Sequence, residues 1–165
     1  MTDPVLFLDI DGVLNCLATW RRPKVGTHRL DPERIELLNR VIQRTGCRIV
    51  VSSTWRHGDF RGPRSCTGIL VQHGVWPRFH RDWRTPDLGP DFSRGEEIAS
   101  WLRRNPVSAY AIVDDEADGI EAGLLPDLRP RFVQTTFEQG LTEAHAERLI
   151  ALLTSQSDLA EERRT

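Results

Sequence analysis

The sequence V-L-F-L-D-I-D-G-V, residues 5–13, carries the strongest local signal for the fold. Its first four residues are all apolar, which is typical of a short strand buried on both faces of a sheet. Asp9 and Asp11 follow at once, and residues two apart in an extended chain point the same way. Gly12 then permits a sharp turn. This stretch therefore predicts a buried strand that delivers two carboxylates to one end of a sheet.

Apolar runs alternate with amphipathic stretches along the rest of the chain, a pattern that predicts an α/β fold with a parallel sheet. Further buried strands are expected at 48–51, 110–113 and 131–135. Start and stop signals predict helices that run from Asp31-Pro32 to Gly46, from the capping box at 93–96 to Asn105-Pro106, and from Thr142 onward.

Two stretches rich in Gly, Pro, Arg and Trp resist this assignment. They are residues 12–30 and 54–92, and the second is expected to hold one short strand near 75–79. Both follow the ends of predicted strands, where the ligand crevice of an open α/β sheet lies. Loops of this length in a compact domain are usually functional.

Length and composition favour one globular domain. The chain has 165 residues, 39% of them hydrophobic and 28% charged, and we expect a single domain over 1–157. The C-terminal residues are polar, so we expect fraying from Ser155 and a polar tail over 158–165. The apolar run at 5–8 is too short to span a membrane, and no basic segment precedes it. The three cysteines form no C-x-x-C pair, so we expect reduced thiols and a cytoplasmic location without a membrane partner.

Three further elements follow strands or open a helix. Ser52 and Ser53 come directly after the second strand, and Arg94 lies in the first turn of a capped helix, where an anion is favoured. Asp114 and Asp115 follow a buried strand and repel each other unless a cation lies beside them, which favours magnesium. Each element has an ordinary alternative. Serines often end strands, surface arginines are common, and D-x-D-G also occurs in Asx turns and calcium loops.

The order and spacing of these elements resemble the haloacid dehalogenase (HAD) superfamily of phosphohydrolases. Residues 9–13 match its first motif and Ser52 its second. Arg94 matches the third, where lysine is commoner, and Asp114-Asp115 matches the fourth in its D-D form. The resemblance covers roughly residues 5–136. Within the superfamily, V-S-S-T-W-R at 51–56 and R-G-E-E-I at 94–98 resemble the HAD domains of RNA-repair proteins, and more distantly the phosphatase part of polynucleotide kinase-phosphatases.

This resemblance implies a three-layer Rossmann-like fold and a mechanism. Asp9 would be the nucleophile that forms an aspartyl-phosphate, and Asp11 would act as general acid and then general base. Mg²⁺ would be bound by Asp9, by the backbone carbonyl of Asp11 and by Asp115, with Asp114 in support. The residues implied in phosphate binding are Ser52, Ser53, Arg94 and Gly12, of which Ser52 and Arg94 also count as catalytic.

The gaps between the motifs are too short for a cap domain, so we expect a capless site or one covered by loops. An open site suits a large substrate such as a nucleic-acid end, and the first 85 residues carry more basic than acidic side chains. Candidate substrate-binding residues are Arg21, Arg22, Trp55 and Arg56. Their alternative roles are core packing for the tryptophan and solvation for the arginines.

Three functions remain open at this point. The first is a polynucleotide 3′-phosphatase and the second a nucleotide or other small-molecule phosphatase. The third is a non-catalytic module that binds phosphate or nucleic acid, and the presence of both Asp9 and Asp11 argues against it because a binding module needs neither a nucleophile nor an acid.

Overall fold

Five parallel strands form the centre of the molecule in a computed structural model that describes residues 2–22, 29–58, 62–117 and 126–162, without the side chains of 126–127 and 155–162. The sheet order is β3-β2-β1-β4-β5. The first strand, β1, pairs with β2 on one side and β4 on the other. The strands are β1 (Val5–Leu8), β2 (Arg48–Val51), β3 (Phe79–Arg84), β4 (Tyr110–Asp114) and β5 (Phe132–Gln134). The α/β fold with a parallel sheet is therefore confirmed.

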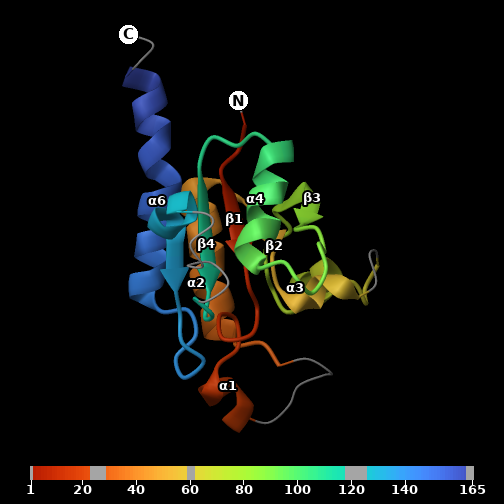
Figure 1. Ribbon diagram of the computed structural model, residues 1–165. Coiled ribbons are helices and arrows are strands. Elements are labelled where there is room, and N and C mark those ends of the chain that lie inside the picture. Colours follow the sequence, from red (N-terminus) through yellow and green to blue (C-terminus); the bar gives the residue numbers. More distant parts are fainter. Residues whose placement is uncertain (1, 23–28, 59–61, 118–125, 163–165) are drawn as a thin grey trace.

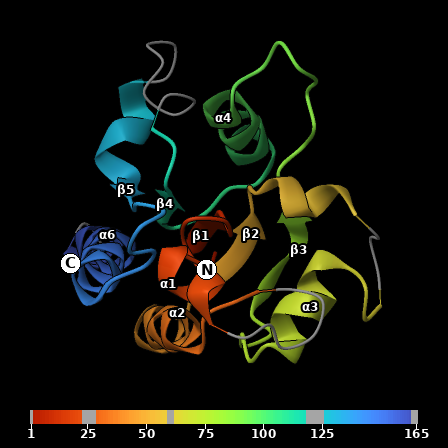
Figure 2. The same cartoon turned by 90° about the horizontal axis from the view of Figure 1, so that it is seen from below.

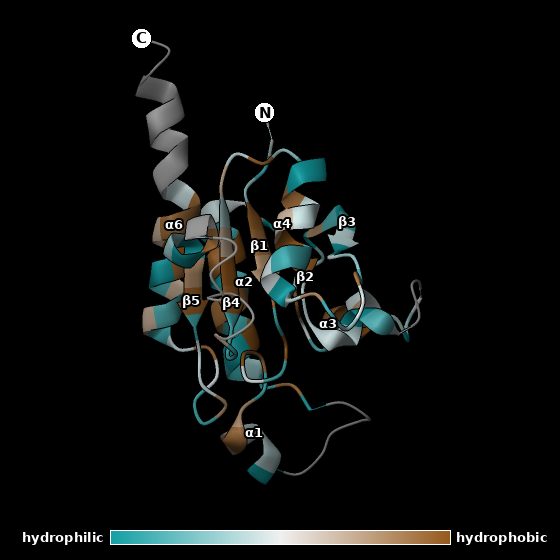
Figure 3. Ribbon diagram, viewed as in Figure 1, coloured by the Kyte–Doolittle hydropathy of each residue, from teal (hydrophilic) through white to brown (hydrophobic). Residues whose placement is uncertain are grey.

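Helices cover both faces of this sheet and make three layers, as Figures 1 and 2 show. One face carries α2 (Pro32–Thr45), α3 (Cys66–Gln72) and α6 (Glu143–Glu162). The other carries α4 (Arg94–Arg104) and the 3₁₀ helix η2 (Pro126–Arg131). Strand side chains alternate between the two cores, which is why the central strands are apolar throughout (Figure 3).

The predicted helix ends are confirmed by their capping contacts. Asp31 accepts a hydrogen bond from the Glu33 amide at 3.0 Å, and Gly46 ends α2 with a φ of 67°. Ser93 and Glu96 form the capping box of α4. The expected fraying from Ser155 is wrong, because α6 continues to Glu162 through residues that include no glycine or proline. Residues 163–165 of the expected tail lie outside the described residues.

The two long segments contain more regular structure than predicted. The first holds α1 (Leu17–Arg21), and the second holds the 3₁₀ helix η1 (Thr54–His57), α3 and β3. The strand expected near 75–79 is displaced to 79–84, because Pro77 has no amide hydrogen to give to a sheet ladder. Strand β3 lies at the sheet edge and is only half-buried, so it lacks the apolar run that marks the central strands. Residues 12–22, 29–58 and 62–93, as described, contain no cap domain.

Within the described ranges, no helix is both long enough and apolar enough to cross a membrane.

The topology places the site. All strands are parallel, so their carboxyl ends share one edge, which points downward in Figure 1. From β1 the chain adds β2 and then β3 on one side of β1. It then crosses to the other side and adds β4 and β5, so the direction of strand addition reverses between β1 and β4. This switch point is where open α/β sheets bind ligands. Asp9 follows β1 there, and Asp114 ends β4.

Removal of the Phe7 side chain tests the smaller of the two cores. Phe7 is fully buried on β1 and packs edge-on against Trp101, with ring centroids 5.3 Å apart. Phe7→Ala should lower the free energy of unfolding by about 3–5 kcal/mol, measured by urea denaturation, because it leaves a cavity. Phe137→Ala, at a 39% exposed phenylalanine, should cost less than about 1 kcal/mol. Similar losses for both variants would contradict this packing.

Candidate active site

Three carboxylates meet at the switch point. Asp9, Asp114 and Asp115 each offer an oxygen, and these oxygens all lie within 4.8 Å of one another. The Asp9 amide donates to the Val113 carbonyl at 3.0 Å, which fixes the end of β1 beside β4. Mg²⁺ holds its oxygen ligands at about 2.0–2.1 Å, so oxygens at this spacing can share one ion after small side-chain adjustments. The sequence prediction that distant carboxylates converge here is met by this geometry.

The guanidinium of Arg94 forms ion pairs with this acidic cluster. Arg94, the first residue of α4, places Nη1 3.4 Å from Asp9 Oδ1 and also pairs with Asp114. Burial and the neighbouring Asp114 raise the pKa of Asp9 to about 7, although Arg94 opposes this shift. Burial likewise raises the pKa values of Asp114 and Asp115. Among the described residues Arg94 alone pairs with carboxylates of this cluster, so the cluster keeps negative charge and offers three oxygens that could hold a metal ion.

The donor set is arranged for such an ion. Asp114 accepts from the Glu116 amide at 2.9 Å as well as from Arg94. The Asp115 carboxylate has only a backbone hydrogen bond from its own amide and no ion pair among the described residues, so it is less engaged than Asp114, which also pairs with Arg94. Its oxygen lies against Gly12, where a Cβ would come within 2.3 Å of Asp115 Oδ2. Gly12 also has a φ of 76°, so both space and backbone conformation require glycine.

Asp11 lies outside the cluster of three carboxylates and is exposed. One of its oxygens accepts from Asn15 Nδ2 at 2.7 Å and the other from Trp55 Nε1 at 2.9 Å. The Asn15 side-chain oxygen in turn accepts from the Gly12 amide at 3.0 Å. These contacts hold the Asp11 carboxylate above the turn. Asn15 was not predicted as a site residue, although its place four residues after Asp11 is a signal for such a turn.

The two adjacent serines take different positions. The Ser53 hydroxyl interacts with the Asp9 carboxylate and lowers its pKa, which partly offsets the effect of burial. Ser53 also accepts from the Trp55 amide at 3.4 Å and so caps η1. The Ser52 hydroxyl is fully buried and has no hydrogen-bond partner among the described residues. The resemblance gives the catalytic role to Ser52 and not to Ser53, and that role stays a prediction.

Arg56 lies beneath the site. Its Nη2 is 2.7 Å from Glu97 of α4, and Nη1 donates to the Ser53 carbonyl at 3.0 Å. Both charged side chains are buried, with 6% and 8% exposed for Arg56 and Glu97. Glu97 also accepts from the Leu88 amide at 3.2 Å, so one carboxylate ties together the segments on either side of the site. The structure thus gives Arg56 a supporting position, and its direct contact with substrate stays a prediction.

The other two arginines predicted to bind substrate lie at the end of α1, beyond the carboxyl edge of the sheet (Figure 1). Arg21 is exposed. Arg22 lies 3.5 Å from Asp31 and 3.4 Å from Glu33, so it pairs with the start of α2. No contact joins either arginine to the three carboxylates in the described residues. Their role in substrate binding stays a prediction.

Crowding of the carboxylates predicts a pH-dependent stability. Asp9 has a higher pKa in the folded metal-free protein than in the unfolded chain, so stability falls as pH rises from about 4 to about 7. Asp9→Asn removes this titration. In EDTA it should raise the free energy of unfolding by about 2 kcal/mol at pH 8 and change it little at pH 4, measured by thermal or urea unfolding. A pH-independent effect would contradict the proposed crowding.

The Arg56–Glu97 pair predicts a large loss of stability when one partner is removed. Glu97→Ala leaves a buried guanidinium without its counter-charge, so it should cost about 3–5 kcal/mol. Glu147→Ala removes an exposed partner of Arg44 and should cost less than about 1 kcal/mol, which makes it a matched control. Equal effects in urea denaturation would mean that the buried pair does not brace the site.

Comparison with known proteins agrees with this geometry. A family model described as the HAD domain in Swiss Army Knife RNA repair proteins matches residues 5–146, which include both aspartate pairs, the serines and Arg94. No curated protein and no solved structure matches the chain. The family match covers most of the chain and all the residues that converge at the switch point. The protein therefore belongs to the family of HAD domains found in Swiss Army Knife RNA repair proteins.

Proposed function

We propose that this domain is a Mg²⁺-dependent phosphomonoester hydrolase that works through an aspartyl-phosphate. The observation that carries the proposal is the buried Asp9 carboxylate, which lies with Asp114 and Asp115 beside Arg94 at the switch point of the sheet. A non-catalytic module would need neither this carboxylate nor Asp11. The membership in a HAD family supports phosphatase-type chemistry.

In the first step an oxygen of Asp9 attacks the phosphorus atom and the bond from phosphorus to the leaving oxygen breaks. Asp11 gives a proton to that oxygen, which departs as an alcohol. Arg94 and the Ser52–Ser53 segment stabilise charge on the transferred group. Asn15 and Trp55 keep the Asp11 carboxylate in place for the proton transfer.

In the second step Asp11 takes a proton from water as the water oxygen attacks phosphorus. The bond from phosphorus to the Asp9 oxygen breaks, and inorganic phosphate leaves. Asp9 and Asp115, with Asp114 in support, would hold Mg²⁺, which when bound offsets the repulsion between the nucleophile and the phosphate. The Asp115 carboxylate lies against Gly12 and has no ion pair among the described residues, which supports this choice of direct ligand.

As substrate we propose the 3′-phosphate at a nucleic-acid end. The described segments form no cap over the site, which leaves room for a long chain. The family to which the domain belongs is named for RNA repair proteins. The alternative is a nucleotide or other small-molecule phosphatase working in the cytoplasm by the same chemistry.

Replacement of the nucleophile tests the reaction. Asp9→Asn should lower kcat for p-nitrophenyl phosphate with Mg²⁺ by at least about 10³-fold, because it removes the attacking oxygen. Acid quenching with radiolabelled substrate should trap phosphate on the unaltered chain and not on this variant. Asp3→Asn makes the same change at an exposed aspartate paired with Arg48 and should leave kcat unchanged. Parental activity in Asp9→Asn would rule out the covalent mechanism.

A substrate panel tests specificity. RNA and DNA oligonucleotides with 3′- or 5′-phosphates, together with free nucleoside monophosphates, should be compared by kcat/KM. The polynucleotide proposal expects the 3′-phosphorylated oligonucleotides to be the best substrates. Equal or better cleavage of free monophosphates would favour the small-molecule alternative.

A further inference from the structure

A groove of about 530 Å³ opens beside the carboxylate cluster, between η1 and the segment 87–92. Arg94 forms part of its wall, and so does Glu116, which lies two residues after Asp114. One end of the groove is therefore next to the atoms that would react. Its volume is that of a site for a small molecule or for one unit of a polymer.

An aromatic ring lies open on the wall of this groove. Phe92 is 51% exposed although it is a large apolar side chain, and Pro90 lies beside it in the lining. Exposure of an apolar ring to water is unfavourable, and this ring does not compensate by packing in the core. Its flat face can stack on another planar ring, which is the usual way in which proteins hold unpaired nucleobases.

The segment that carries Phe92 is held in place. The Leu88 amide donates to Glu97 at 3.2 Å, and the Gly89 amide donates to the Asp87 side chain at 3.0 Å. The Phe92 amide donates to the Gly89 carbonyl at 3.2 Å. Glu97 also binds Arg56 of η1, so this one side chain connects the two walls of the groove, which are η1 and the segment 87–92. A ring mounted on such a segment loses little freedom when a ligand binds.

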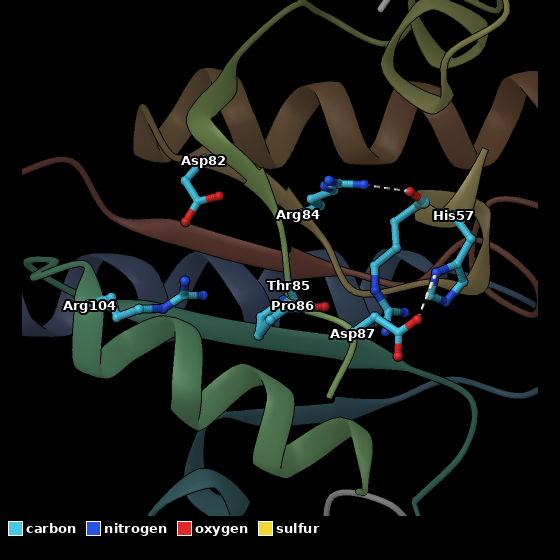
Figure 4. A pocket seen from close by; sticks show the side chains of 8 residues that line it. His57, Asp82, Arg84, Thr85, Pro86, Asp87 and Arg104 are labelled. Atoms are coloured by element: carbon cyan, nitrogen blue, oxygen red, sulfur yellow. Dashed lines mark hydrogen bonds and ion pairs between the residues drawn. The ribbon is translucent and has the colours of Figure 1, made fainter. Parts of the chain in front are cut away.

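The charges in the groove favour a neutral occupant. Both of its arginines are already paired, Arg56 with Glu97 and Arg94 with the carboxylates of the site. With histidine counted as neutral, the exposed charged side chains in its lining are acidic, at Asp87 and Glu116. Asp87 points toward His57 at 3.5 Å, where the groove adjoins a second pocket (Figure 4). A second phosphate deep in the groove would be repelled by these carboxylates, whereas an uncharged nucleoside would not be repelled.

We infer that the groove binds the nucleoside that bears the phosphate to be cleaved, and that Phe92 stacks on the planar base of this nucleoside. The inference rests on the proposed function for the position of the reacting phosphate at Asp9. Phe92 is thereby a residue that determines specificity, because it distinguishes phosphates on a nucleoside from phosphates on an aliphatic alcohol.

The test measures binding in the Asp9→Asn chain, which keeps the groove without turnover. Titration calorimetry with Mg²⁺ should compare adenosine 3′-monophosphate with inorganic phosphate, which lacks a ring. Adding Phe92→Ala should weaken nucleotide binding about tenfold and leave phosphate binding unchanged, and Phe92→Trp should restore the affinity. Trp76→Ala removes a 44% exposed aromatic ring that precedes β3, at the opposite edge of the sheet, and should change neither affinity.

The outcomes separate this inference from the proposed function. Unchanged nucleotide binding in Phe92→Ala, or equal loss of nucleotide and phosphate binding, would overturn the stacking role. The chain with Asp9 intact should lose about tenfold in kcat/KM for adenosine 3′-monophosphate but not for glycerol 2-phosphate when Phe92 is replaced by alanine. If that chain hydrolysed neither compound while the calorimetric difference held, the groove would stand and the phosphatase proposal would fail.

Discussion

Repulsion among three carboxylates at one end of a buried sheet is the constraint on which the site depends. Asp9, Asp114 and Asp115 are brought together by the register of β1 and β4, and in the part of the chain that the structure describes only Arg94 forms ion pairs with them. Such an arrangement lowers stability unless a cation joins it, and folds keep it where chemistry requires it. The glycine that lets Asp115 approach and the helix that begins at Arg94 both serve this one cluster.

The buried ion pair between Arg56 and Glu97 connects the site to the neighbouring groove. Glu97 binds Arg56 on one side and the Leu88 amide on the other, so it joins η1 to the segment that bears Phe92. The same carboxylate therefore supports the loop that follows the serines and the groove that leads away from Asp9. Desolvation of this pair is costly, and its hydrogen bonds to backbone groups offset that cost while fixing two otherwise irregular segments.

The parts of the fold that could be predicted have strong local signals. The central strands are uninterrupted apolar runs, and the main helices begin and end at capping residues such as Asp31 and Gly46. The predicted position of strand β3 was wrong because this edge strand is only half-buried and so lacks an apolar run. The short helices α1, η1 and α3 were missed because their stability comes from tertiary contacts and single caps, for instance Ser65 on the Gly68 amide at 3.0 Å.

Local sequence patterns were enough to predict the parallel α/β fold, and the motifs were enough to predict the family. The carboxylates, serines and arginine of the site could be predicted because each follows a strand or opens a helix that a local pattern identifies. Only the folded chain reveals which serine faces Asp9, which of the two adjacent aspartates pairs with Arg94, that Arg56 is buried against Glu97, and that Phe92 lines a groove. These features depend on distances between segments far apart in the chain, and local pattern carries no information about such distances.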